Sequence, residues 1–186
     1  MKLNLGCGHQ KIADWVNVDL MPACHPDVVL DLEHFPYPWE DDSVSQVILN
    51  HVLEHLGQLT ETYLKIIQEL YRVCRHGAIV YIRVPHPRHD DFLGDPTHVR
   101  PITAEGMRMF DQSFNRECIE NKFADTPLGI YLGVNFKITH VEYLLEQKYI
   151  AKIRNGELTE NDALELMREH ANICKQIDIE WVCIKE

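Results

Sequence analysis

Histidines and carboxylates cluster in one polar stretch of this chain. Residues 83–103 read R-V-P-H-P-R-H-D-D-F-L-G-D-P-T-H-V-R-P-I-T. A histidine has an unperturbed pKa of about 6.5, so it can accept a proton at neutral pH. His98 has a carboxylate three residues before it, and we take His98 with Asp95 as a candidate base and its orienter. His86 and His89 are further candidates for acid-base chemistry or substrate contact.

Two other interpretations of this stretch stay open. Imidazole and carboxylate groups also bind divalent metal ions, but the stretch contains no ligand spacing such as H-E-x-x-H, so we assign no metal ligand. The remaining interpretation is structural. Asp95 and Thr97 would form a turn around Pro96 and help to start the next helix, while the histidines bind solvent or backbone.

A glycine turn near the amino terminus is a second candidate site. Gly6-Cys7-Gly8 follows the apolar residues 2–5, and glycine allows a positive φ and a close approach of the backbone to a ligand. A dinucleotide-binding fingerprint would read G-x-G-x-x-G, with an acid about 20 residues later. Here Lys11 occupies the third glycine position, and Asp19 lies only eleven residues after Gly8. The turn therefore does not favour NAD as a ligand.

A sheet is the framework that can bring these residues together. Apolar runs predict strands over residues 2–5, 15–18, 27–30, 45–49 and 78–84. Helical periodicity predicts a helix over 60–75, capped by Thr60 and ended by Gly77. The link 6–14 between the first two strands has room for only a turn or two of helix. The order of the apolar strands and the helix predicts a doubly wound, mainly parallel α/β sheet.

The predicted strands end on polar residues, among them Asp19, Asp31 and Asn50. In an open parallel sheet, ligands bind outside the carboxyl ends of the strands. A carboxylate at that edge can accept two hydroxyls of a ribose, and a polar residue at the next strand end can recognise the edge of an adenine. Together with the glycine turn, these strand ends predict a site for a ligand of nucleoside type.

The second half of the chain has weaker patterns. Residues 135–145 and 177–184 alternate between apolar and polar types, which predicts two more strands. Thr103 is expected to start a short helix that runs to about residue 110, and Thr159 with Asp162 resembles a capping box inside a helical insertion over about 157–174. Residues 111–134 show no clear period and stay unassigned.

Composition limits the class of protein and its partners. The 186 residues predict a single domain over 1–186. Lys and Arg total 18 against 29 Asp and Glu, and the net charge of −11 disfavours nucleic acids and anionic membranes as partners. The sequence has no run near the roughly 18 apolar residues of a membrane helix, no signal peptide and no C-x-x-C pair. We therefore expect a cytoplasmic protein.

Four segments of the chain resemble a known family. L-N-L-G-C-G (3–8), N-V-D-L (17–20), V-L-D-L (29–32) and V-I-L-N-H-V-L-E-H-L (47–56) are similar to motifs of the class I S-adenosylmethionine-dependent methyltransferases. The resemblance implies a Rossmann-like, mostly parallel seven-stranded sheet that ends in an antiparallel strand pair. It also implies S-adenosylmethionine as the cofactor and places the loop 85–103 on the acceptor side of the fold.

The resemblance implies roles for residues at the first two strand ends. The Gly6-Cys7-Gly8 turn would face the methionine portion of the cofactor. Asp19 would bind the ribose hydroxyls, with Leu20 beside the adenine. One departure is that Asn4 stands where many members carry an acid, two residues before the first glycine.

The next two strand ends receive roles in the same way. Asp31 and Leu32 would flank the adenine. Asn50 and His51 would line the channel in which the methyl group meets its acceptor, and His55 would reach the same space.

The expected function is transfer of a methyl group from S-adenosylmethionine to an O or N atom of a small or medium acceptor molecule. Two alternatives stay open at this point. The protein could bind the cofactor without catalysis, as a sensor or as a subunit that supports a partner. It could also be a metal-dependent hydrolase that uses the His and Asp residues of the loop 85–103. The acceptor and the oligomeric state do not follow from the sequence.

Overall fold

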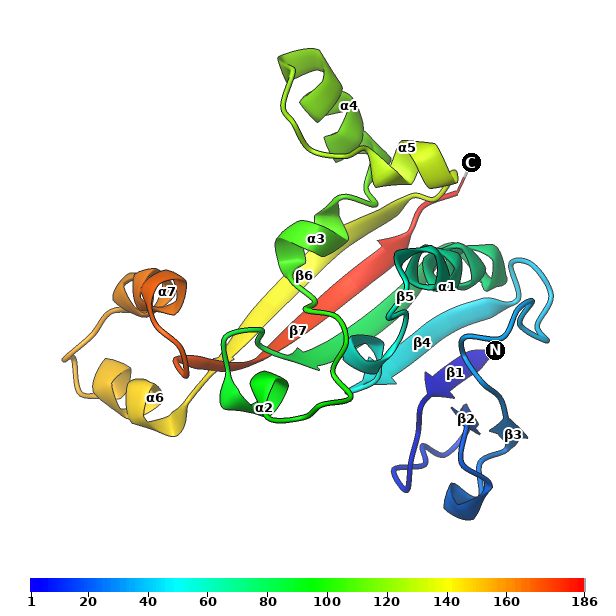
Figure 1. Cartoon of the computed structure of the whole chain (residues 1–186), viewed down its shortest axis with the longest axis horizontal. Coiled ribbons are helices and arrows are strands. Elements are labelled where there is room, and N and C mark those ends of the chain that lie inside the picture. Colours follow the sequence, from blue (N-terminus) through cyan, green and yellow to red (C-terminus); the bar gives the residue numbers. More distant parts are fainter. Residues whose placement is uncertain (186) are drawn as a thin grey trace.

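The computed structural model describes residues 1–185 and contains one seven-stranded sheet (Figure 1). Its strands are β1 (Lys2–Leu5), β2 (Val16–Asp19), β3 (Val28–Val29), β4 (Val44–Asn50), β5 (Cys74–Pro85), β6 (Phe136–Leu145) and β7 (Cys174–Cys183). They lie in the order β3-β2-β1-β4-β5-β7-β6. The first five strands are parallel, and β7 is antiparallel to both β5 and β6. The predicted fold class, with its closing antiparallel pair, is confirmed.

Helical segments connect the strands. They are η1 (Pro22–Cys24), η2 (Leu53–His55), α1 (Thr60–Val73), α2 (Asp90–Leu93), α3 (Ala104–Arg108), α4 (Gln112–Asn121), α5 (Leu128–Leu132), α6 (Gln147–Arg154) and α7 (Glu160–Glu169). The two helix starts predicted from Thr103 and from the Thr159–Asp162 capping box are confirmed. The unassigned residues 111–134 form α4 and α5, and α6 is a further helix that no pattern predicted.

The predicted start of α1 at residue 60 is confirmed, but both of its predicted end signals were wrong. The helix begins at Thr60 itself, after Leu59, and no side chain caps it. It ends at Val73, and β5 follows at once from Cys74. Gly77 lies inside that strand, where its φ of 74° bends the chain. The turn signal at this glycine therefore marks an irregularity in β5 and not the end of the helix.

The hydrophobic core lies on one face of the sheet. Side chains alternate along a strand, so Val80 and Ile82 of β5 are buried while Tyr81 is half-buried and Arg83 is exposed. Ile67 belongs to the same core as Val80 and Ile82 and represents the buried face of α1. In Figure 1, α1, α2 and α3 lie in front of the sheet. Each fully buried aliphatic side chain contributes roughly 1.5–3 kcal/mol, so this face carries most of the stabilisation.

The other face of the sheet carries an open groove. Residues 6–15, all described, contain turns and no helix, as the short link predicted. Asn4 holds this link in place, because its Nδ2 donates to the Gln10 carbonyl (2.9 Å) and to Asn17 Oδ1 (3.0 Å). The link and the exposed faces of β4, β5 and β7 line a groove of about 830 Å³, which we call the open-face groove.

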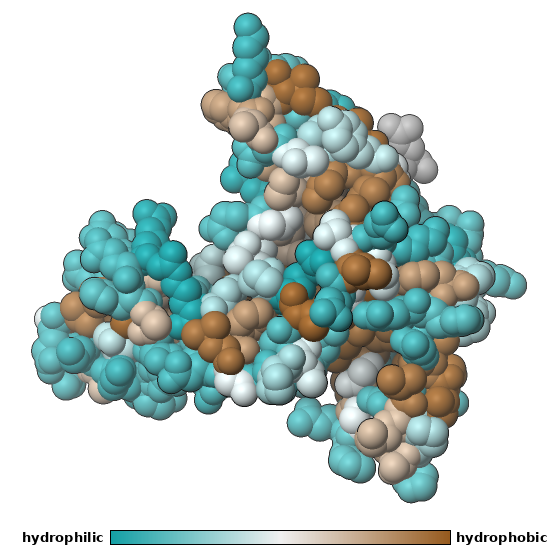
Figure 2. Space-filling view, in the orientation of Figure 1, coloured by the Kyte–Doolittle hydropathy of each residue, from teal (hydrophilic) through white to brown (hydrophobic). Residues whose placement is uncertain are grey.

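Helices α6 and α7 form an arm with a small core of its own. Met167, Ile173 and Cys174 make this second cluster, with Tyr143 and Leu145 of β6 packed against it. The arm projects from one end of the sheet, and Figure 2 shows its surface as mostly hydrophilic. Within residues 1–185, every helix is too short or too polar to cross a lipid bilayer.

Candidate functional site

A cavity of about 290 Å³ lies at the carboxyl ends of the parallel strands. We call it the strand-end cavity. It is lined by residues that follow four strands and by η2: Gly6, Asp19, Leu20, Leu30, Asp31, Leu32, His51, Val52, His55 and Leu56. Seven of these ten are residues for which the sequence predicted cofactor binding. The parallel pairing of neighbouring strands puts their ends at one edge, and this is why residues far apart in the chain meet there.

Gly6 shapes the wall of this cavity. Its φ is 66°, a left-handed conformation that favours glycine. A Cβ added at Gly6 would lie 2.4 Å from Cγ2 of Val52, which is a severe overlap. The absence of a side chain at Gly6 therefore lets the turn pack directly against Val52 in the cavity wall. Gly8 also has a positive φ of 50°, but an added Cβ there would meet no atom within 4 Å.

Asp19 ties the glycine turn to the end of β2. Its Oδ2 accepts a hydrogen bond from the Gly8 amide (2.7 Å), and its Oδ1 accepts one from the Met21 amide (2.8 Å). A carboxylate oxygen can accept two hydrogen bonds, so each oxygen keeps a lone pair for a ligand hydroxyl. Asp31 is held in the same manner, because its Oδ1 accepts from the Glu33 amide (2.9 Å). Both acids therefore have fixed positions before any ligand binds.

Three predicted cofactor residues lie elsewhere. Cys7, Gly8 and Asn50 line the open-face groove, on the other side of the glycine turn. Gly6 and His51 line both hollows, so the groove and the cavity adjoin at these two residues. Burial raises the pKa of the Cys7 thiol, which keeps it neutral and unsuited to nucleophilic chemistry. Asn50 Oδ1 is buried without a hydrogen-bond partner among residues 1–185.

A buried acid lies behind His51. Glu54 has no exposed surface, and its Oε1 is 3.3 Å from Nδ1 of His51. This contact raises the pKa of His51 above its ordinary value, and burial of the ring opposes the shift. The sequence analysis did not select Glu54. The available signal was an acid between the apolar residues Leu53 and Leu56, at a position that helical packing would bury.

The loop after β5 brings His98 to this acid. The Val99 amide donates to the Glu54 carbonyl (2.9 Å), which fastens the loop to η2. The His98 ring stacks on Phe92 with 5.3 Å between ring centroids, and it packs edge-on against His55 at 4.6 Å. His98 and His55, 43 positions apart in the chain, therefore lie side by side.

Asp95 does not orient His98 through a hydrogen bond, in contrast to our expectation. Its Oδ2 is 3.8 Å from Nε2 of His98, whereas Nδ1 of His98 bonds the Phe92 carbonyl at 2.8 Å. Oδ1 of Asp95 accepts from the Thr97 amide (2.8 Å) and from the Thr97 hydroxyl (2.6 Å). This is the turn that the structural interpretation predicted, and it holds the segment just before His98.

His86 and His89 lie outside both hollows. His89 is buried, and its Nδ1 accepts from the Asp91 amide at the start of α2 (3.0 Å). Its Nε2 is 3.1 Å from Oε1 of Glu146, next to the arm. Nδ1 of His86 accepts from the Arg88 amide (3.2 Å), and burial lowers the pKa of His86. Of the three loop histidines, His98 packs against His55 in the wall of the strand-end cavity, and His86 and His89 lie further away.

The hydrogen-bond acceptors of the cavity fit S-adenosylmethionine. A ribose needs hydrogen-bond acceptors, which Asp19 and Asp31 supply, and Gly6 brings the backbone of the turn to the cavity wall. Leu20 is 64% exposed at the rim and offers an apolar surface to a flat base.

Comparison with known proteins agrees with this geometry. Residues 3–82 match the family model described as a methyltransferase domain. The match covers β1 to most of β5, the part of the chain that carries the predicted cofactor residues. The fold of a SAM-dependent methyltransferase from Archaeoglobus fulgidus is similar to that of this chain, with a TM-score of 0.62 and 17% identity over 97% of this chain and 85% of that one.

Two further solved structures share this fold. A SAM-dependent methyltransferase from Methanosarcina mazei has a TM-score of 0.58 and 12% identity, over 100% of this chain and 92% of its own. A putative S-adenosylmethionine-dependent methyltransferase from Listeria monocytogenes has a TM-score of 0.54 and 13% identity, over 99% and 91% of the two chains. A search of curated proteins by sequence found no match.

Proposed function

We propose that this protein is a methyltransferase, which transfers the methyl group of S-adenosylmethionine to an O or N atom of a small or medium acceptor. The observation that carries the proposal is the order of residues along the strand-end cavity. Asp31, Asp19 and Gly6 follow β3, β2 and β1, and His51 follows β4, so their order matches that of the strands in the sheet. We call the part with Gly6, Asp19 and Asp31 the cofactor side. The acceptor side is the part with His51 and His55, together with Glu54 and His98, which pack behind these two lining residues.

On the cofactor side, each residue has a binding role in this proposal. Asp19 accepts hydrogen bonds from the ribose hydroxyls, and Leu20, Asp31 and Leu32 surround the adenine. The Gly6-Cys7-Gly8 turn lies against the methionine portion. When bound, S-adenosylmethionine supplies a methyl group on a positively charged sulfur, which is already electrophilic. The contribution of the protein is therefore mainly alignment of the acceptor with that methyl group.

On the acceptor side, histidines surround the place where the acceptor would bind. His51 lines both hollows, and His55 lines the strand-end cavity with His98 packed against it. In this proposal His51 accepts the proton that an O–H or N–H acceptor must lose, and its contact with Glu54 stabilises the ring once it is protonated. The predicted cytoplasmic location and the exclusion of nucleic acid and membrane partners rest on composition and stay predictions.

Titration calorimetry tests the proposal directly. We expect the purified protein to bind S-adenosylmethionine and S-adenosylhomocysteine with micromolar dissociation constants and to leave NAD unbound. A mass-spectrometric screen of small alcohols, carboxylates and amines would then search for a product that is one methyl group heavier. Absence of binding for both sulfur ligands would contradict the cofactor assignment and the reaction with it.

A further inference from the structure

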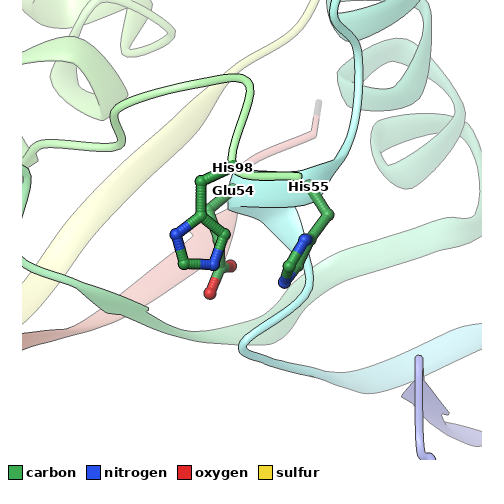
Figure 3. A group of neighbouring side chains, drawn as sticks. All are labelled: Glu54, His55 and His98. Carbon is green, nitrogen blue, oxygen red and sulfur yellow. The ribbon is translucent and has the colours of Figure 1, made fainter. Parts of the chain in front are cut away.

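One buried carboxylate and two imidazole rings converge on the acceptor side. Glu54, His55 and His98 each offer one ligand-type atom, and these three atoms lie within 4.8 Å of one another. Figure 3 shows the three side chains pointing to the same side of the ribbon, with the His98 ring in front of the Glu54 carboxylate. We propose that Glu54, His55 and His98 form a binding site for a divalent transition-metal ion.

The hydrogen bond that His98 makes through Nδ1 leaves Nε2 available to bind a metal ion. Nδ1 of His98 is 2.8 Å from the Phe92 carbonyl oxygen, which can only accept a hydrogen bond. Nδ1 must therefore carry the proton, and in the neutral ring Nε2 has the lone pair. Histidines that bind metals usually donate their other N–H to a carbonyl or a carboxylate in this way.

A chain of hydrogen bonds fixes His55 in the same tautomer, with the proton on Nδ1. The Thr97 hydroxyl has one proton, and it donates this proton to Oδ1 of Asp95 at 2.6 Å. Its oxygen is therefore an acceptor for Nδ1 of His55, 3.0 Å away. Nδ1 of His55 carries the proton, and Nε2 is left with a lone pair. Asp95 and Thr97 thus act as positioning residues for the His55 ring.

In the described part of the chain, Glu54 has a single charged neighbour, His51, and lacks the hydrogen bonds that a buried anion requires. The side chain is fully buried, and neither carboxylate oxygen has a hydrogen-bond partner among residues 1–185. Nδ1 of His51 approaches Oε1 to 3.3 Å, and Oδ2 of Asp95 adds a second carboxylate 3.8 Å from Nε2 of His98. A buried charge without such partners is strongly unfavourable. A cation between this carboxylate and the two Nε2 lone pairs would satisfy all three groups.

The donor set selects the class of ion. Two imidazoles with one carboxylate suit Zn²⁺, Mn²⁺ or Fe²⁺, whereas Ca²⁺ and Mg²⁺ prefer sites made of oxygen atoms alone. Three protein ligands leave coordination positions open. Since His55 also lines the strand-end cavity, an acceptor with a hydroxyl or carboxylate oxygen could fill one of them. This last step rests on the proposed function.

The site can be tested by titrating the whole chain with metal ions. The protein is treated with a chelator, dialysed, and titrated with ZnCl₂, MnCl₂ and CaCl₂ by calorimetry. We expect one Zn²⁺ or Mn²⁺ ion to bind per chain with a micromolar or lower dissociation constant, and no binding of Ca²⁺. Glu54→Gln keeps the shape of the side chain and removes its charge, and it should weaken metal binding by more than about a hundredfold.

Controls separate a lost ligand from a lost fold. His170→Gln removes an exposed histidine next to α7 and should leave the metal affinity unchanged. Thermal unfolding reports whether Glu54→Gln is folded, and His98→Gln is the second test if it is not. The inference is overturned if neither Zn²⁺ nor Mn²⁺ binds the unaltered protein, or if both variants bind them as tightly as it does.

A parallel titration with S-adenosylmethionine keeps this inference distinct from the proposed function. Binding of the cofactor without binding of metal overturns the metal site and leaves methyl transfer standing. Binding of metal without binding of the cofactor supports the site and contradicts the proposed function.

Discussion

The cofactor side of the strand-end cavity is built from residues that follow β1, β2 and β3, whereas the acceptor side joins η2 to a loop some 40 residues further along the chain. On the cofactor side, the hydrogen bonds that hold the site residues join positions close together in the sequence, such as Gly8 and Asp19. On the acceptor side, Thr97 binds His55 over a separation of 42 residues. The comparison shows that strand order alone positions the first side, and that docking of a loop positions the second.

The two sides also differ in what holds them. Backbone amides and a left-handed glycine shape the cofactor side, and its acids keep lone pairs for a ligand. The acceptor side places a fully buried carboxylate beside two histidine rings, an arrangement that is costly without a cation. We therefore expect variants of the first side to act on cofactor binding and variants of the second to act on binding of a cation.

The largest effect is expected for Gly6→Ala. The left-handed φ and the overlap with Val52 should together destabilise the protein by about 3 kcal/mol and abolish cofactor binding. Gly8→Ala is the matched control, because its φ is also positive but its added Cβ meets nothing, and about 1 kcal/mol is expected. Urea unfolding measures both, and equal effects would show that close packing at Gly6 is unimportant.

Asp19→Ala should act mainly on the ligand. Loss of charged hydrogen bonds to the ribose is expected to weaken S-adenosylmethionine binding by more than about tenfold in calorimetry. Asp125→Ala removes an exposed acid outside both hollows and should have no effect. If Asp19→Ala binds the cofactor normally while remaining folded, the cofactor side does not use this carboxylate.

Thr97→Val tests the hydrogen-bond chain on the acceptor side. Without the hydroxyl, nothing holds the proton on Nδ1 of His55, so binding of Zn²⁺ or Mn²⁺ should weaken by about tenfold. Thr97→Ser keeps the hydroxyl and should restore the affinity. Long-range proton–nitrogen NMR spectra report the tautomer of His55, and an unchanged tautomer in Thr97→Val would remove the positioning role.

The smallest effect concerns a distant contact that supports the cofactor side. Glu69 of α1 accepts from the Tyr37 amide (2.7 Å) and pairs with Arg72 (2.8 Å), which holds the link that carries Asp31. The hydrogen bond from Arg72 holds the pKa of Glu69 below its ordinary value, although partial burial opposes this. Since the pKa is lowered on folding, the stabilisation is present above the pKa of the unfolded chain and is lost as the pH falls through the lower folded value.

Glu69→Gln should therefore be less stable than the unaltered protein by about 1 kcal/mol near pH 7. The difference should shrink as thermal unfolding is measured at progressively lower pH, below about 4. A difference that does not change with pH would mean that the charge of Glu69 is not what holds the link.

Local patterns in the sequence determined the strand framework and the cofactor side. Alternating or continuous apolar runs predict strands, because a strand in a sheet buries one or both of its faces. Gly6, Asp19 and Asp31 stand where those strands end. The Thr159–Asp162 capping box likewise depends on residues three positions apart, and it formed as predicted. In each case the deciding interaction lies within a few residues or follows from parallel strand pairing.

Only the tertiary structure decided which polar residues share the acceptor side. His98 and His89 belong to the same loop, yet one packs against His55 and the other against Glu146. Glu54 has no distinctive spacing, and its importance comes from complete burial beside rings supplied by another segment. Contacts between distant segments depend on how a loop docks onto the sheet, and no short-range period in the chain encodes that geometry.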